Sequence, residues 1–350
     1  MTNAELLKSK IYEKLDYQPE PPHYKGKVPW KVQQQIAATN GYHYENLIGE
    51  LGEYPIPDIP IERASEQKLL LDIGCGWGRW LVSSALKNYI PIGIDLRLEF
   101  CETARQVLQD HGLKGYTAVA DLKHLPFKEN VFDVVWSFSV IQHTHKLRLL
   151  SCISHIHRIL KSKGYCFLEF PNKGGIRNRF GPVKEEHKTK DDYNAWSVRY
   201  YSIKEYRKFF YDTFKNFYFR NHSFLGIGIL PNDLQFAKGL KNRLGIGTSL
   251  LLSKIAEIIK PLTYLSDSVY IKCNKQTGKA NQTILDEFMG LHAKDPSNNL
   301  NIICLLQCPI SGGDLQWDQA NNRLVSLSAN VYYPIINDVP ILIASEAIGL

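Results

Sequence analysis

Paired cysteines are missing from this 350-residue chain. Its seven cysteines are scattered, and no two of them are spaced as C-x-x-C. An odd number of isolated thiols is typical of reduced cysteines, and structural zinc needs clustered cysteine or histidine ligands. The sequence therefore predicts neither a disulfide framework nor a metal site.

Long hydrophobic runs are also missing. The first residues are polar and charged, unlike those of a secretory signal. The nearest candidate for a membrane span, LGIGTSLLLSKIAEII at residues 244–259, is short and is interrupted by Lys254 and Glu257. We therefore expect a cytoplasmic protein without a transmembrane segment.

Basic residues are scarce at the end of the chain, although they are in excess elsewhere. The whole chain holds 42 lysine and arginine residues against 35 aspartate and glutamate residues, whereas residues 281–350 hold two against seven. Such a change in charge is typical of a domain boundary. A basic body attracts nucleic acid or anionic lipid, but charge spread this widely is more typical of an ordinary solvated surface.

The chain does contain a buried strand that runs into a glycine-rich loop. The stretch LLLDIGCGWGRW at residues 69–80 places an aspartate before glycines at every second position. Open α/β folds bind nucleotides at such a strand-to-helix turn, because glycine admits positive φ and lets a ligand lie against bare backbone. The dinucleotide fingerprint G-x-G-x-x-G would need glycine at position 79, where this chain has Arg79. A nicotinamide dehydrogenase is therefore disfavoured.

Strand and helix patterns alternate around this loop, which predicts a parallel α/β sheet. We expect strands at residues 69–73, 92–95, 116–120, 132–137, 165–170, 217–222 and 268–273. We expect helices at residues 4–15, 32–38, 79–88, 98–112, 146–160 and within 234–265. A capping box of Ser202 and Glu205 predicts a further helix through Tyr211.

The loop and the strand ends that follow it resemble those of the class I S-adenosylmethionine-dependent methyltransferases. LLLDIGCGWGRW is similar to motif I of that family, which wraps the methionine half of the cofactor. The resemblance implies a Rossmann-like, seven-stranded sheet, mostly parallel with an antiparallel last strand, and S-adenosyl-L-methionine as the cofactor. It implies a cofactor site made of Asp72, Gly74, Cys75, Gly76, Gly78, Asp95, Leu96, Asp121, Leu122 and Ser137.

Three acidic residues at successive strand ends support this interpretation. Asp95 has two oxygens for the two ribose hydroxyls, or it caps the helix that begins near Leu98. The family implies that Asp121 accepts from the adenine amino group, with the Leu122 amide beside the ring; alternatively, Asp121 only forms a turn. Asp72 either holds the amino group of the cofactor or makes a structural hydrogen bond to loop amides.

The catalytic residue is expected beyond the fourth strand. In SVIQHTH, His143 occupies a position at which small-molecule methyltransferases of this class often carry histidine. Histidine can accept a proton from an attacking hydroxyl near neutral pH, or His143 only packs below the pocket. His145 is expected to face water. In the loop, Trp77 is expected to pack against the leading segment, and Arg79 meets the cofactor carboxylate or faces solvent.

The flanking segments complete the expected domain layout. We expect a cap segment at 1–60, the methyltransferase domain at 61–280 with a lid at 171–200 and an insertion at 231–265, a linker at 281–299 and a β-rich module at 300–350. The cap segment either covers the substrate pocket or packs on the sheet edge. Arg177, Arg179 and Lys184 of the lid either bind an anionic acceptor group or are solvated.

Residues 300–350 contain short β-rich runs separated by turn residues. The pieces CPISGGDL, RLVS and YPIINDVPILI resemble the small tRNA-methyltransferase-activator family, in particular its zinc-free bacterial relatives. The last turn, usually Asp-Gly in that family, is Asn337–Asp338 here. The resemblance implies an activator-like module fused in cis.

Together these patterns predict a methyltransferase that acts on a small-molecule or a glycan- or lipid-linked acceptor. The fourth strand is not followed by the Asp/Asn-Pro-Pro-aromatic tetrad that marks methylation of exocyclic base amines. Two alternatives stay open. One is a tRNA or protein methyltransferase whose activator is fused in cis, although nucleic acid is not the favoured acceptor. The other is a non-catalytic module that only binds the cofactor.

Overall fold

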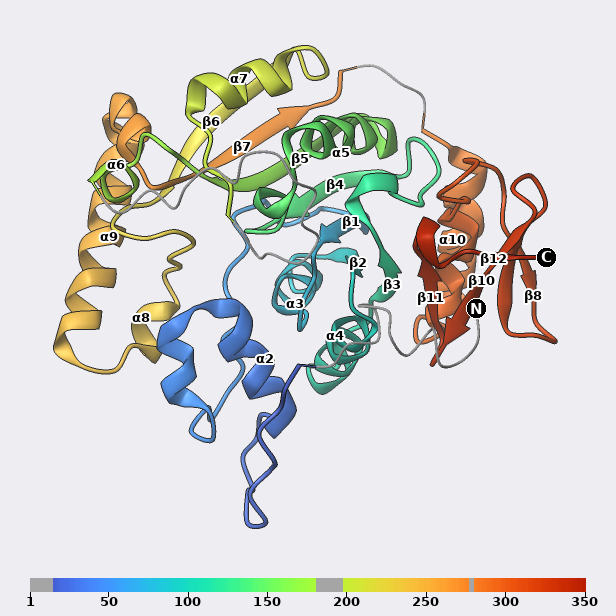
Figure 1. Cartoon of the computed structure of the whole chain (residues 1–350), viewed down its shortest axis with the longest axis horizontal. Helices are drawn as coiled ribbons and strands as arrows, with labels where there is room; N and C mark the ends of the chain where they lie inside the picture. Colours follow the sequence, from blue (N-terminus) through green and yellow to red (C-terminus); the bar gives the residue numbers. More distant parts are fainter. Residues whose placement is uncertain (1–14, 181–197, 277–279) are drawn as a thin grey trace. The chain divides into compact units, whose positions relative to one another are not determined.

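The computed structural model describes residues 15–180, 198–276 and 280–350 (Figure 1), and these residues divide into two units. Unit 1 is drawn from residues 1–128 and 282–350, and unit 2 from residues 129–281. All seven strands expected for the sheet are formed, three in unit 1 and four in unit 2. The helix expected at residues 4–15 falls almost entirely outside the described residues.

Parallel strands form the first half of the unit 1 sheet. β1 (Lys68–Ile73) pairs with β2 (Tyr89–Asp95), and β2 pairs with β3 (Tyr116–Ala120). The connections are α3 (Arg79–Ala85) and α4 (Leu98–Asp110). The strands are almost entirely buried, as in sheets that helices cover on both faces. Because the three strands are parallel, their carboxyl ends lie at one edge of the sheet.

The carboxyl-terminal segment continues this sheet. β11 (Val339–Leu342) pairs with β3 in parallel. β10 (Val331–Ile336), β9 (Arg323–Ser326) and β8 (Gln316–Asp318) follow as antiparallel neighbours, and β12 (Ile348–Gly349) also pairs with β10. The expected short β-rich runs are confirmed. With these five additional strands, the described residues hold twelve strands, five more than the seven expected for the methyltransferase sheet.

Hydrophobic packing also joins the carboxyl-terminal segment to the rest of unit 1. Val339 and Ile341 of β11 share one buried cluster with Leu98 and Cys101 of α4 and Val119 of β3. Burial of aliphatic side chains in a common cluster is the main favourable term in such packing. The segment is therefore held by the same helix and strand that follow the glycine loop.

A side chain closes the part of the β3 edge that β11 leaves uncovered. Asn299, at the start of η5 (Asn299–Leu305), accepts from the Thr117 N–H (2.7 Å) and donates to the Thr117 carbonyl (2.8 Å). It also donates to the carbonyl of Asp338 (2.7 Å). Because buried backbone groups need hydrogen-bond partners, the amide takes the place of a neighbouring strand.

The turn between β10 and β11 confirms the expected turn at Asn337–Asp338. Both residues have positive φ, 50° and 62°, and Ile336 pairs with Val339 across the two-residue loop. Such loops need two left-handed residues, and asparagine and aspartate tolerate this conformation better than most side chains. Arg105 of α4 donates to the carbonyl of Asn337 (2.9 Å), which ties the turn to the helix.

The interval expected to be a linker contains a helix instead. α10 (Gln282–Lys294) buries Leu285 and Phe288, and the ring of Phe288 meets Tyr116 of β3 edge-on, with centroids 5.3 Å apart. Residues 282–294 of the expected linker are therefore helical and packed against β3. The polar composition concealed the helix because only a narrow stripe of it is buried.

Unit 2 contains a four-stranded mixed sheet. β4 (Phe132–Ser137) pairs in parallel with β5 (Leu160–Pro171), β5 pairs with β7 (Ser268–Asn274), and β7 pairs with β6 (Asn216–Ser223). β7 is antiparallel to both neighbours, which confirms the expected antiparallel last strand. α5 (Lys146–Ile159) connects β4 with β5 and matches the helix expected at residues 146–160.

The other helices of unit 2 follow the sequence patterns closely. The capping box of Ser202 and Glu205 is formed and opens α7 (Ile203–Tyr211), as expected. The expected inserted helices are α8 (Asp233–Phe236), α9 (Leu240–Ile258) and η4 (Lys260–Leu265). Of the expected lid, the short α6 (Ile176–Phe180) is described, whereas residues 181–197, with Lys184, lie outside the described residues.

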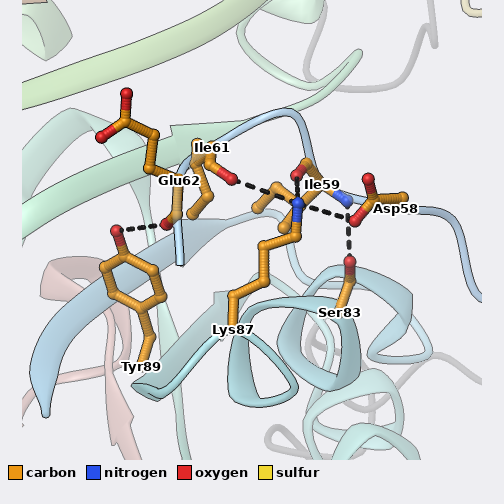
Figure 2. A network of polar contacts seen from close by, with 7 residues as sticks. All are labelled: Asp58, Ile59, Ile61, Glu62, Ser83, Lys87 and Tyr89. Atoms are coloured by element: carbon orange, nitrogen blue, oxygen red, sulfur yellow. Dashed lines mark hydrogen bonds and ion pairs between the residues drawn. The ribbon is translucent and has the colours of Figure 1, made fainter. Parts of the chain in front are cut away.

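The leading segment of unit 1 contains α2 (Trp30–Asn40), as expected, and η1 (Tyr42–Leu47), which was not expected. Helices are lacking from the proline-rich stretch that follows, at residues 51–67. Polar contacts fasten this stretch to the end of α3 (Figure 2). The Lys87 ammonium donates to the carbonyls of Ile59 (2.6 Å) and Ile61 (3.1 Å), and the Ile59 N–H donates to the Ser83 hydroxyl (2.8 Å). These contacts support the interpretation that the segment packs against the sheet body.

Candidate active site

The glycine loop takes a backbone path that other residues adopt only with strain. Gly74, Gly76 and Gly78 all have positive φ, at 76°, 51° and 96°. The N–H groups of Gly74 and Cys75 both donate to the carbonyl of Ile94 in β2, at 2.8 and 3.0 Å. The loop is thereby fixed at the carboxyl ends of β1 and β2, where open α/β sheets bind ligands.

The glycines serve different purposes. A Cβ atom at Gly78 would lie 2.9 Å from the Cα of Ala104, so this glycine allows α4 to pack closely against the start of α3. A Cβ atom at Gly76 would meet no described atom within 4 Å. Bare backbone at Gly76 therefore faces open space, which fits a loop against which a ligand lies.

Asp95 holds the loop from the neighbouring strand. Its Oδ2 accepts from the Gly76 N–H (3.1 Å) and its Oδ1 accepts from the Arg97 N–H (3.1 Å). Burial raises the pKa of Asp95, although these backbone N–H groups act in the opposite direction. The residue that precedes α4 is Arg97, whose side chain makes no capping bond. Asp95 is therefore not the N-cap of that helix, and the carboxylate instead supports the loop.

Asp72 lies beneath the loop in an unusual environment. It is fully buried, and among the described residues neither carboxyl oxygen has a hydrogen-bond partner. Burial raises the pKa of Asp72 to about 8, even though the Arg79 guanidinium acts to lower it. The expected alternative, a hydrogen bond to loop amides, is thus not formed. Because an unsatisfied buried carboxyl is costly, the geometry fits a ligand that brings a positive charge or N–H donors.

Asp121 follows β3 and caps the short η2 (Leu122–His124). Its Oδ1 accepts from the Lys123 N–H (3.0 Å), so the turn-forming role considered for it is present. Asp121 and Leu122 are both half-buried. A capping bond to one oxygen leaves the second oxygen of a carboxylate available to accept, so a contact to an adenine amino group stays a prediction.

The remaining side chains of the loop are absorbed by packing. Trp77 is 1% exposed, donates from Nε1 to the Asn40 side chain (3.1 Å) and stacks on Tyr54, which confirms the expected packing against the leading segment. The Cys75 side chain is buried beneath the loop, where a Cβ atom on Gly93 would lie 2.9 Å from its sulfur. Only the backbone of Cys75 is thus placed to meet a ligand. Leu96, in contrast, is 51% exposed.

Two predicted site residues belong to unit 2. Ser137 is buried at the carboxyl end of β4, and His143 ends η3 (Ile141–His143). Arg199 donates from its guanidinium to the His143 carbonyl (2.6 Å), so the backbone of this turn is tied to the segment before α7. His145 does not simply face water: its ring accepts from the Leu147 N–H (3.3 Å) and caps α5.

Sequence reasoning missed a carboxylate next to Ser137. Glu169 of β5 is 1% exposed, and its Oε2 accepts from the Ser139 hydroxyl (2.7 Å). Because Ser137 pairs with Leu168, Glu169 and Ser139 lie just beyond the same edge of the β4–β5 pair. The available signal was one acidic residue inside the apolar run CFLEFP. Buried carboxylates of this kind are candidates for proton transfer.

The start of the expected lid is firmly anchored. The Asn172 side chain donates to the carbonyls of Tyr264 (3.1 Å) and Ser266 (2.8 Å). The buried Asp267 accepts from the N–H groups of Arg177 (2.8 Å) and Asn178 (3.2 Å) at the start of α6. Arg177 and Arg179 therefore project from a fixed base, whereas their predicted contact with an anionic acceptor is untested.

The described residues contain neither a cluster of metal ligands nor a membrane-spanning helix. No group of three or more histidine, cysteine, aspartate or glutamate side chains in the described part of the chain is arranged to hold a metal ion. Within the same ranges, no helix is both long enough and apolar enough to cross a bilayer.

Comparisons with known proteins agree with the geometry. Residues 71–168 match the family model of a methyltransferase domain. An uncharacterized protein of Methanocaldococcus jannaschii, MJ0638, is 30% identical over 196 residues, which are 55% of this chain and 69% of that protein. The ubiquinone biosynthesis O-methyltransferase of Haemophilus ducreyi is 33% identical over 111 residues, 30% of this chain and 46% of that enzyme.

A separate relationship concerns a short stretch of the chain. A UPF0434 protein of Bartonella bacilliformis is 51% identical over 43 residues, which are 12% of this chain and 78% of that protein. The chain therefore combines similarity to a methyltransferase domain with similarity to about three quarters of a small protein.

Proposed function

We propose that this S-adenosyl-L-methionine-dependent methyltransferase, which also contains a segment similar to a UPF0434 protein, methylates a small-molecule or a glycan- or lipid-linked acceptor. One observation supports a cofactor site at particular residues. The carboxyl of Asp72 is buried, and its oxygens lack hydrogen-bond partners among the described residues. It lies beneath a loop whose backbone at Gly76 faces open space.

The polar groups at the strand ends of unit 1 match the polar groups of this cofactor one by one. Asp72 would accept from the ammonium of the methionine half, whose positive charge would balance the negative charge of the buried carboxylate. Asp95 would accept from the ribose hydroxyls while it keeps its bonds to the Gly76 and Arg97 amides. Asp121 and the Leu122 amide would meet the adenine edge. The loop backbone, including Cys75, would line the sulfonium side.

The cofactor, when bound, supplies an electrophilic methyl group. The contribution of the chain is to orient the acceptor and, if the acceptor atom arrives protonated, to remove that proton. We propose that the ring of His143, which follows β4, accepts this proton. Glu169 is the second candidate, because it is a buried carboxylate that already holds the hydroxyl of Ser139.

Support for a small acceptor comes from one named relative. The Haemophilus ducreyi enzyme is a ubiquinone biosynthesis O-methyltransferase, and 111 residues of it are similar to this chain. A hydroxyl acceptor would need a base, which agrees with the presence of His143 and Glu169 in unit 2.

The test is to incubate the full chain with methyl-labelled cofactor and a cell extract separated into small-molecule, lipid, RNA and protein fractions. We expect label in the small-molecule or lipid fraction. No label in that fraction should appear with Asp95→Ala, which serves as the matched inactive chain. Label that accumulates in RNA or protein instead would overturn the acceptor assignment. Cofactor binding without transfer to any fraction would favour the non-catalytic alternative.

The second candidate function, a tRNA or protein methyltransferase with its activator fused in cis, has one specific observation in its favour. Residues 300–350, which resemble the activator family, contribute β11, which extends the sheet at β3, and they share a buried cluster with α4. A fused segment in this position would stabilise the cofactor-binding unit itself. Label in purified tRNA, lost after heat denaturation of the enzyme, would decide for this function.

A further inference from the structure

The polarity of α9 is the reverse of that of an ordinary surface helix. Leu240, Leu244, Leu251, Ile255 and Ile258 are between 36% and 83% exposed. At 3.6 residues per turn, these five side chains fall within roughly 60° of the helix circumference. Surface helices of globular proteins normally turn such an aliphatic stripe toward the core. We refer to these five residues as the outer stripe of α9.

The opposite face of α9, which packs against β6, is small and partly polar. Its buried residues are Ile246, Ser249 and Ala256. The Ser249 hydroxyl accepts from the Phe224 N–H (3.1 Å), and the neighbouring Ser253 hydroxyl donates to the carbonyl of His222 (2.9 Å). Hydrogen bonds thus hold the helix in place with its aliphatic side outward. The exposed stripe is therefore a consequence of how the inner face is fixed and not of a loosely attached helix.

Positive charge borders the outer stripe. Lys241 lies on one side of it, Arg243 and Lys254 lie on the other, and all three are exposed. The one acidic residue of the helix, Glu257, forms an ion pair with Arg220 of β6. Further exposed lysines precede and follow the helix at positions 238 and 260. The edge of the stripe is therefore strongly cationic.

We propose that α9 is a membrane-surface helix, which lays its outer stripe into the headgroup region of an anionic phospholipid bilayer. An aliphatic face bordered by lysine and arginine is the pattern of helices that lie in the plane of the membrane interface. The aliphatic side chains enter the boundary between headgroups and acyl chains, and the lysines and arginine attract the anionic headgroups. The helix lies on the bilayer and does not cross it.

Charge favours a lipid surface over a second copy of the chain. Two copies packed through the outer stripe would bring two cationic borders together, whereas an anionic bilayer neutralises them. The proposal goes beyond the methyl-transfer function, since it concerns where the protein binds and holds for any acceptor. If the acceptor is lipid-linked, however, the same helix would bring unit 2 to the surface that contains it.

The test uses the full chain and two kinds of vesicle, phosphatidylcholine alone and phosphatidylcholine with phosphatidylglycerol. We expect cosedimentation with the anionic vesicles that weakens as salt is raised. The double variant Leu251→Gln/Ile255→Gln should weaken this binding by about tenfold or more, because two inserted aliphatic groups are lost. The variant Lys241→Gln/Lys254→Gln should weaken it by about fivefold for each charge removed. Leu327→Gln, at a leucine that is 64% exposed in unit 1, is the matched control and should bind like the parent.

A second measurement reports depth directly. Six of the seven natural cysteines are buried and Cys304 is partly buried, so a new surface cysteine can be labelled selectively. An environment-sensitive dye on Leu251→Cys should shift its emission to the blue when anionic vesicles are added, whereas the same dye on Leu327→Cys should not.

Three results would overturn the proposal. They are no binding to anionic vesicles, binding that the Leu251→Gln/Ile255→Gln change leaves intact, and a dimer in sedimentation velocity that the same change dissolves. The last result would assign the stripe to a second copy. Cofactor affinity, measured by calorimetry without vesicles, should be the same for the parent and this variant. Failure of the membrane proposal is thus separate from failure of the methyltransferase assignment.

Discussion

The strand ends of the two units differ in what they offer to a ligand. In unit 1, β1, β2 and β3 lead to Asp72, Asp95 and Asp121 beside a loop of bare backbone. In unit 2, β4 leads to Phe138, whose ring is stacked on that of Trp136 with centroids 6.3 Å apart. The first arrangement is typical of a site for a polar, partly cationic molecule, and the second is typical of hydrophobic core packing.

This contrast explains why the cofactor is easier to infer than the acceptor. A carboxylate and a glycine have few reasons to follow a buried strand at fixed spacing, so each carries information about a ligand. An aromatic residue at the end of a strand is explained equally well by core packing. The following predictions test whether the division of roles between the units is real.

The largest effect is expected for Asp95→Ala, which should abolish measurable cofactor binding. The change removes an acceptor for two hydroxyls and also the bond that holds the Gly76 amide at 3.1 Å. At about 1.5–3 kcal/mol for each hydrogen bond to a charged group, the affinity should fall at least about a hundredfold. Titration calorimetry measures it, and thermal melting checks that the variant is folded. An unchanged affinity would contradict the assignment of unit 1 as the cofactor site.

The next effect should appear in unit 2 and in the rate only. His143→Gln is expected to slow methyl transfer by about a hundredfold, because the ring is assigned as the proton acceptor. Cofactor affinity should not change, since the ring is assigned to the acceptor and not to the cofactor. Single-turnover measurements with labelled cofactor separate the two quantities.

Glu169→Gln provides the matched comparison for that experiment. The amide keeps the shape of the side chain and can still accept from the Ser139 hydroxyl. If this variant is slow and His143→Gln is normal, the carboxylate is the proton acceptor and the histidine assignment is wrong. If either variant loses cofactor affinity, cofactor binding is not confined to unit 1.

An effect of intermediate size is expected for Asp72, which should release a proton when the cofactor binds. Since the pKa of Asp72 is about 8, the carboxyl is mostly protonated at pH 7 in the absence of ligand. A bound ammonium favours the ionised form, so cofactor binding at pH 7 should release close to one proton. Calorimetry in two buffers with different ionisation enthalpies measures this release. Asp72→Asn should abolish the release and weaken binding by about tenfold.

The Asp72→Asn substitution, which should weaken cofactor binding, should stabilise the ligand-free protein. Burial raises the folded pKa of Asp72 above its ordinary value of 3.8, so the folded state binds a proton that the unfolded state loses. The ligand-free parent should therefore lose stability relative to Asp72→Asn as pH rises from about 4 to about 8. A gap in melting temperature that does not widen over this range would contradict the buried, unpartnered carboxyl.

Local patterns of the sequence were enough to find most elements of both units. The seven strands, the helix that Ser202 opens and the Asn337–Asp338 turn all depend on neighbouring residues, through side-chain periodicity, capping and backbone conformation. The packing of Trp77 against the leading segment could also be anticipated.

Contacts between distant parts of the chain could not be found in this way. The pairing of β11 with β3 and the closure of the β3 edge by Asn299 join residues far apart in sequence, and neither has a local signature. The helix α10 has only a weak local signature, because only Leu285 and Phe288 mark its buried side. The bond between Ser139 and Glu169 depends on the register of two strands, which one sequence does not reveal.

The smallest effect tests whether unit 2 can be weakened without disturbing unit 1. Ser202→Ala removes the hydroxyl that accepts from the Glu205 N–H and should cost about 1 kcal/mol of stability. Burial acts to raise the pKa of Glu205, but hydrogen bonds from Ser202 and the charges of Lys173 and Lys146 outweigh it and lower this pKa. The contribution of the box is therefore present at neutral pH and is lost as pH falls below the ordinary range of a glutamate.

Chemical denaturation of parent and Ser202→Ala at pH 7 and at pH 3 measures both parts of this prediction. The difference in unfolding free energy should be larger at pH 7 than at pH 3, because the contribution of the box is lost as Glu205 takes up a proton. Cofactor affinity at pH 7 should be equal in the two proteins, because Ser202 and Glu205 lie in unit 2 and the three carboxylates lie in unit 1. A loss of affinity in Ser202→Ala would mean that the capped helix supports the cofactor site, and the contrast between the two units would then have to be abandoned.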